Sequence, residues 1–116
     1  MTGLEIAKAS AKILDDKLGV DVKILHVEKV TVLCDYFVIV SGQSNTQVGA
    51  LADEVVFQLE KLGLTPERKE GVPTGGWVVL DYISVIIHIF HTEARQFYSL
   101  ERLWADAKEI ELQAVL

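Results

Sequence analysis

The fold class is decided by ten residues, Asp35-Tyr36-Phe37-Val38-Ile39-Val40-Ser41-Gly42-Gln43-Ser44. Residues 36–40 are aromatic or β-branched, as pleated sheets favour, and their near-continuous apolar character predicts a central strand buried on both faces. Gly42 ends this strand, and Ser44 followed by Gln47 matches the capping-box pattern of a helix start. A buried strand that leads directly into a helix indicates an α/β fold.

Two amphipathic helices flank this strand in the sequence. Residues 2–18 open with a capping-box pattern, carry apolar side chains at helical spacing and stop before Gly19. Residues 44–62 carry a long apolar stripe and stop before Gly63. Both helices should therefore cover the sheet through one apolar face.

The remaining elements complete a mixed sheet. A C-terminal helix should begin at Thr92 or Glu93, and residues 105–116 should extend that helix or fray. Further strands are predicted at 20–27, 66–69, 77–82 and 84–90. We therefore expect one α/β domain over residues 1–116, with about five strands packed with helices.

The composition limits the classes of function. The net charge is −6, and the eleven basic residues are scattered among acidic ones, which disfavours direct reading of nucleic acid. An acidic surface suits a basic protein partner better. The chain shows no membrane-spanning run and no secretory signal, so a cytoplasmic location is expected. Cys34 is the sole cysteine, and a packed side chain is the favoured interpretation over a nucleophile.

Two local patterns are candidate sites of chemistry. The turn Gly42-Gln43-Ser44 lies where nucleotidyltransferases place a Gly-Ser pair, but Asp81 stands alone where their chemistry needs paired carboxylates. His88, His91 and Glu93 are candidate metal ligands, but His88 and His91 are three residues apart at the end of a predicted strand, which places them on opposite faces if the strand continues. We therefore predict no catalytic residues, no metal site and no cofactor.

Alternation divides the last two predicted strands between two faces. An all-aliphatic set should pack against the helices: Val85, Ile87 and Ile89. The opposite set mixes aromatic, aliphatic and polar groups, as protein-binding surfaces do: Trp77, Val79, Asp81, Ser84, Ile86, His88 and Phe90. The alternative is that Trp77 covers the sheet edge and Asp81 caps a turn. We expect the mixed face to stay free for a partner.

Several long motifs resemble the Iojap-like ribosomal silencing factors. The match runs in order from the first helix to about Ala107. The motifs that carry it are 35–44, Gln47-Val48, Glu70-Gly71, 77–82, 88–90 and 95–104. The family typically has Gly-Asp after an Asp-Tyr pair. In this chain the pair is Asp81-Tyr82, and Ile83-Ser84 follow it.

The resemblance implies a fold similar to nucleotidyltransferases without their catalytic site. It also implies binding to the large ribosomal subunit through its universal L-fourteen protein, which would block joining of the small subunit when nutrients are short. Relatives in organelles act in large-subunit assembly. The matching positions Glu70, Trp77, Asp81 and His88 become candidate partner contacts. Arg95, Phe97 and Tyr98 match the family too but are interpreted first as structural, and Arg95 could pair with a carboxylate. An active or degenerate nucleotidyltransferase and a self-associating scaffold, a homodimer, remain alternatives.

Overall fold

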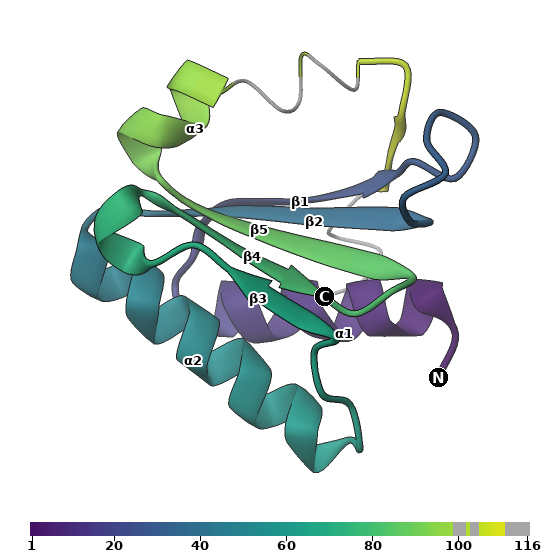
Figure 1. The fold of residues 1–116 in the computed structure, drawn as a ribbon, viewed down its shortest axis with the longest axis horizontal. Coiled ribbons are helices and arrows are strands. Elements are labelled where there is room, and N and C mark those ends of the chain that lie inside the picture. The colour runs from purple at the N-terminus through teal and green to yellow at the C-terminus, as the bar shows by residue number, and fades with distance from the viewer. Residues whose placement is uncertain (99–101, 103–104, 111–116) are drawn as a thin grey trace.

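A computed structural model describes residues 1–98, 102 and 105–110 of the chain (Figure 1). Its elements are α1 (Gly3–Asp16), β1 (Val20–His26), β2 (Tyr36–Gly42), α2 (Asn45–Lys61), β3 (Arg68–Glu70), the 3-10 turn η1 (Pro73–Gly75), β4 (Trp77–Asp81), β5 (Val85–His91), α3 (Thr92–Tyr98) and β6 (Lys108–Ile110).

The described strands form one mixed sheet in the order β3-β4-β5-β2-β1-β6. Strands β2 and β5 run parallel, and every other neighbouring pair is antiparallel. The connection between the parallel strands β2 and β5 includes helix α2, as crossovers between parallel strands usually do. The short turn after Asp81 joins β4 and β5 as an antiparallel hairpin. The predicted mixed α/β sheet is confirmed, with β2 in its interior.

The sheet has a sixth strand that the sequence did not predict. Residues 105–116 were expected to extend the C-terminal helix or fray, but β6 pairs with β1 through Ile24 and Ile110. Two of the three β6 residues are exposed, so the segment shows no apolar alternation. Its main-chain groups instead complete the edge of β1, and main-chain pairing leaves no mark in the side-chain pattern.

Two layers of apolar side chains lie on opposite faces of the sheet. Helices α1 and α2 cover one face, and α3 lies over the other (Figure 1). The larger cluster joins α1 and α2 to the sheet and includes Val38, Val40, Val78, Leu80, Val85, Ile87 and Ile89. The smaller cluster, on the α3 side, contains Leu25, Val27, Cys34, Phe37, Ile39 and Phe90. The aliphatic set of β5 therefore packs against the helices, as predicted.

Helix α1 confirms its predicted start and revises its end. Thr2 Oγ1 accepts from the Glu5 amide at 3.1 Å, and the Glu5 carboxylate accepts from the Thr2 amide at 2.8 Å. The helix ends at Asp16, two residues earlier than predicted, because Leu18 adopts a φ of 65°. Gly19 is required for a different reason: a Cβ there would overlap the Val40 side chain.

Helix α2 begins with one half of the predicted capping box. Ser44 Oγ accepts from the Gln47 amide at 3.1 Å, as the pattern indicates. The Gln47 side chain, however, accepts from the Gln43 amide at 2.6 Å instead of the Ser44 amide. The turn between β2 and α2 is therefore tied to the helix one residue further upstream. Among the described helices, none combines the length and apolar character that crossing a membrane requires.

Candidate protein-binding face

Strand register brings the four predicted site residues onto one face of the sheet. Glu70 on β3 lies opposite Val79 on β4, and Val79 lies opposite His88 on β5. Residues paired across a sheet share a face, so these three side chains form one row. Trp77 and Asp81 lie two positions either side of Val79, so they share that face too. The sequence assigned three of the four to one face, and the register adds Glu70.

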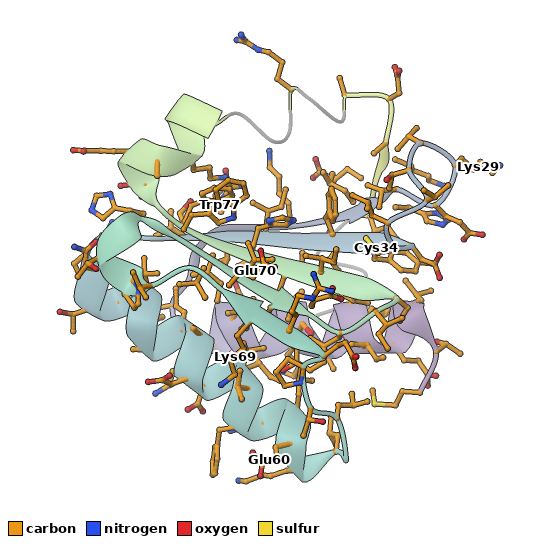
Figure 2. The ribbon with its side chains drawn as sticks, in the orientation of Figure 1. Lys29, Cys34, Glu60, Lys69, Glu70 and Trp77 are labelled. Atoms are coloured by element: carbon orange, nitrogen blue, oxygen red, sulfur yellow. The ribbon has the colours of Figure 1, made fainter. Side chains whose placement is uncertain are left out.

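The outward part of this face is a small patch, which we call the β4 patch and define as Glu70, Trp77, Val79 and Asp81. Glu70 is exposed and the other three are half-buried. Glu70, Trp77 and Val79, together with Gly71, line a shallow hollow of about 280 Å³. Figure 2 shows Trp77 on the side of the sheet where α3 lies. An aromatic wall and a carboxylate therefore border one concavity.

Gly71 allows the backbone to close around this hollow. Its φ is +81°, in the left-handed region that favours glycine. A Cβ at this position would overlap the carbonyl oxygen of Trp77. The backbone at Gly71 therefore lies close to the carbonyl oxygen of Trp77. This close approach brings the end of β3 near the start of β4, and so brings Glu70 near Trp77.

The Trp77 indole contacts His88 and Phe90 of β5. Its Nε1–H donates to His88 Nδ1 at 3.2 Å. The indole also stacks on Phe90, with 4.9 Å between the ring centroids and 27° between the ring planes. Trp77 thus presents part of its surface in a defined orientation.

His88 is almost entirely enclosed, with 7% of its surface exposed. Its ring meets Phe37 edge to face, with 4.8 Å between the ring centroids. Burial lowers the pKa of His88 to about 4, so the ring is neutral at physiological pH. Because Nδ1 accepts from Trp77, the single ring proton is on Nε2, and no described residue accepts a hydrogen bond from it.

Asp81 also fulfils the alternative role considered for it. Its carboxylate accepts from the Ile83 amide at 2.8 Å and so caps the β4–β5 turn. Ile83 itself has a φ of 72° and an exposed side chain, an unfavourable conformation for a β-branched residue. Across the sheet, Arg68 lies opposite Asp81 and within 3.8 Å of the Glu70 carboxylate. Arg68 could not be singled out from the sequence, because its proximity to Glu70 and Asp81 depends on strand register.

The mixed face is less free than the sequence analysis expected. Two of its residues, His88 and Phe90, are buried, as are the neighbouring Phe37 and Ile39 of β2 on the side of the sheet where α3 lies. Arg95 of α3 reaches across this side and is itself buried. Among the described residues of the mixed face and the adjacent Glu70, those that stay exposed or half-buried are Glu70, Trp77, Val79 and Asp81 at the β3–β4 end, and Ser84 and Ile86 near the β4–β5 turn.

Arg95 acts structurally, as predicted, and binds more than a carboxylate. Its Nη1 donates to the carbonyl oxygen of Asp21 at 2.7 Å, to Ser41 Oγ at 2.9 Å and to the carbonyl oxygen of Val20 at 3.3 Å. Its Nη2 lies 3.4 Å from the Asp21 carboxylate. These contacts join α3 to β1 and β2. Phe97 and Tyr98, also interpreted as structural, have side chains outside the described part of the chain.

The groups considered for chemistry have structural surroundings. Cys34 is buried and its thiol donates to the Tyr36 carbonyl oxygen at 3.3 Å; burial raises its pKa to about 11, so the thiol stays protonated. Ser44 caps α2, as described above. Within residues 1–98, 102 and 105–110, no three histidine, cysteine or acidic side chains lie close enough to hold a metal ion.

Comparisons with known proteins agree with this architecture. The family described as "Ribosomal silencing factor during starvation" matches residues 2–116. A protein named ribosomal silencing factor from Halalkalibacterium halodurans is 34% identical over 116 residues, which cover 100% of this chain and 99% of that protein. A crystal structure of a protein from Chromobacterium violaceum has a TM-score of 0.86 and 34% identity, covering 90% of this chain and 88% of that one.

A more distant relative extends the comparison to an organelle. A mouse protein named "Mitochondrial assembly of ribosomal large subunit protein 1" is 31% identical over 87 residues, which cover 72% of this chain and 38% of that protein. Relatives of this chain are thus named for regulation or assembly of ribosomes. The chain belongs to the ribosomal silencing factor family, whose members have a role in ribosome silencing.

Proposed function

We propose that this protein represses translation by binding the large ribosomal subunit through its L-fourteen protein, so that the small subunit cannot join. The observation that carries the proposal is the β4 patch: a half-buried tryptophan and two carboxylates share one face at the β3–β4 end of the sheet, where Glu70 and Trp77 line a hollow. Family membership supports the ribosome as the target. The proposed contacts are Glu70, Trp77 and Asp81, with His88 beneath them.

The chemistry of the patch fits a basic protein better than RNA. Tryptophan is among the residues that contribute most binding energy at protein interfaces. Glu70 and Asp81 place two of the acidic residues of a chain with a net charge of −6 on this patch, which would attract a positively charged protein and repel phosphates. Ribosomal proteins are mostly basic, so an acidic factor can recognise one without reading RNA.

Size is sufficient for a steric mechanism. The molecule measures 33 × 32 × 27 Å, and a stable interface needs about 800 Å² from each partner. One bound copy could therefore occupy a joining surface without any bond being made or broken. We propose that it acts in the cytoplasm, and that inhibition follows the occupancy of large subunits.

Co-sedimentation with separated ribosomal subunits tests the proposal. The chain should sediment with large subunits and not with small ones. Trp77→Ala should weaken this binding by about 2 kcal/mol or more if Trp77 is a central anchor. Phe57→Ala is the matched control, because Phe57 is an exposed aromatic residue on α2, which covers the opposite face of the sheet. If both variants bind large subunits as tightly as the unsubstituted chain does, Trp77 is not part of the binding site.

Self-association through the same patch is the second candidate. An exposed aromatic surface can pair with its own copy, and a dimer that buries Trp77 would compete with ribosome docking. Light scattering at several concentrations distinguishes the two. A dimer that Trp77→Ala dissociates, together with no binding of large subunits, would favour the scaffold over the silencing factor.

A further inference from the structure

We propose that His88 is a positioning residue for docking, whose imidazole holds the Trp77 indole in the orientation that the partner protein meets. This inference rests on the proposed function and extends it. His88 was expected to touch the partner, but with 7% of its surface exposed it offers the partner almost no contact area. Its effect on binding must therefore pass through Trp77.

The contacts with His88 and Phe90 constrain different parts of the indole. The hydrogen bond from Nε1 to His88 Nδ1, at 3.2 Å, fixes the direction of the indole edge. The stack on Phe90 fixes the plane of the rings. A side chain tied at its edge and at its face has lost most of its rotamer freedom before the partner arrives.

His88 is held firmly enough to serve as a support. Its ring is in register with Val79 on one side and Ile39 on the other, inside the sheet. It meets Phe37 edge to face and lies parallel to the Phe90 ring, with 6.2 Å between those centroids. The acceptor nitrogen that Trp77 uses is therefore fixed by packing.

The choice of histidine here is unfavourable for stability alone. Nε2 is buried and finds no acceptor among the described residues, although the neutral ring must carry its proton there. Burying an unsatisfied donor costs more than burying an apolar side chain of similar size. Native proteins break such rules mainly at functional sites. The hydrogen bond that orients Trp77 is a reason to keep a polar ring at this position.

Loss of the support should weaken docking without unfolding the protein. Immobilising one side chain at an interface costs about 0.5–1.5 kcal/mol, which corresponds to a roughly 2- to 10-fold change in Kd. His88→Leu removes the acceptor and the unsatisfied donor together. This variant should therefore bind large subunits roughly 2- to 10-fold more weakly, while its unfolding midpoint stays equal or rises.

Two readouts test the inference. The chain has two tryptophans, so a Trp104→Phe background leaves Trp77 as the only indole. Fluorescence anisotropy and acrylamide quenching then report the mobility and accessibility of Trp77 without any ribosome present. His88→Asn is the conservative variant, because its amide oxygen can accept from Nε1 near the place of Nδ1.

The expected result has three parts. His88→Leu lowers the anisotropy, increases quenching and weakens subunit binding, and His88→Asn restores all three. Unchanged fluorescence in His88→Leu overturns the inference, as does altered fluorescence with full subunit binding. If the unsubstituted chain fails to sediment with large subunits, the proposed function itself fails, and the fluorescence data separate that failure from a failure of the Trp77 support.

Discussion

Replacing Arg95 by methionine tests how α3 is fixed to the sheet. Methionine keeps most of the aliphatic stem but removes every donor. Arg95 is buried, and its guanidinium reaches residues 54 to 75 positions earlier in the chain. The substitution therefore leaves the carbonyl oxygens of Val20 and Asp21 and the hydroxyl of Ser41 without this donor.

The magnitude follows from the geometry. The bonds to the Asp21 carbonyl oxygen and Ser41 Oγ are short, at 2.7 and 2.9 Å, whereas the bond to the Val20 carbonyl oxygen is long at 3.3 Å. Hydrogen bonds from a charged donor contribute about 1.5–3 kcal/mol each. Counting the two short bonds near the lower end of that range, Arg95→Met should lower the free energy of unfolding by about 3–4 kcal/mol.

The ion pair with the Asp21 carboxylate should contribute little in comparison. The two charged atoms lie 3.4 Å apart, but the Asp21 side chain is 59% exposed, and exposed pairs contribute about 0–1 kcal/mol. Asp21→Asn is the matched control, because asparagine removes the charge and tolerates the left-handed backbone, with a φ of 52°, found at this position. It should cost less than about 1 kcal/mol.

Urea unfolding followed by far-UV circular dichroism measures both changes. With an m-value of about 2 kcal/mol/M, Arg95→Met should lower the midpoint by roughly 1.5–2 M, and Asp21→Asn by less than about 0.5 M. Equal losses in the two variants would show that the carboxylate, and not the carbonyl oxygens, anchors α3. A loss below about 1 kcal/mol in Arg95→Met would refute the structural role altogether.

Three further predictions concern the sheet. Burial lowers the pKa of His88 from 6.5 to about 4, so on acidification the unfolded chain binds this proton before the folded chain does. The free energy of unfolding should therefore be highest above about pH 6.5 and fall by about 3 kcal/mol towards pH 4. Urea titrations at stepped pH measure this loss, which His88→Asn should lessen. Gly71→Ala should lower the free energy of unfolding in urea by roughly 3 kcal/mol, because its methyl group would overlap the carbonyl oxygen of Trp77. Gly63→Ala is the control: Gly63 also has a positive φ, +84°, but no atom lies near its Cβ position, so this variant should lose only about 1 kcal/mol. Equal losses in the two variants would rule out the overlap. Ile83→Gly should stabilise the protein by about 0.5–1 kcal/mol in thermal melts, because glycine has no Cβ and tolerates the positive φ at this position; a loss of stability would contradict the strain.

The helices and most strand faces could be predicted from local pattern. Side-chain direction repeats every 3.6 residues in a helix and every two in a strand, so a run of residues determines its own inner and outer face. The capping box at Thr2 and the burial of Val85, Ile87 and Ile89 followed from that rule. The resemblance to ribosomal silencing factors likewise depended on contiguous motifs, and the family comparison confirmed it.

The candidate site depended on contacts that no local pattern encodes. The row from Glu70 through Val79 to His88 exists because three strands pair in one particular register. The burial of His88 and its hydrogen bond to Trp77 follow from that pairing and from the aromatic neighbours it brings together.

The class of fold, the inner and outer faces of the helices and main strands, and the family could all be predicted from the order of the amino acids. Three features emerged only once the chain was folded: β6 completes the edge of β1, Arg95 joins α3 to β1 and β2, and the centre of the mixed face is buried while the β4 patch stays accessible. The physical reason is that main-chain pairing and long-range hydrogen bonds join atoms far apart in the chain, whereas side-chain periodicity records only which way each residue points within its own element.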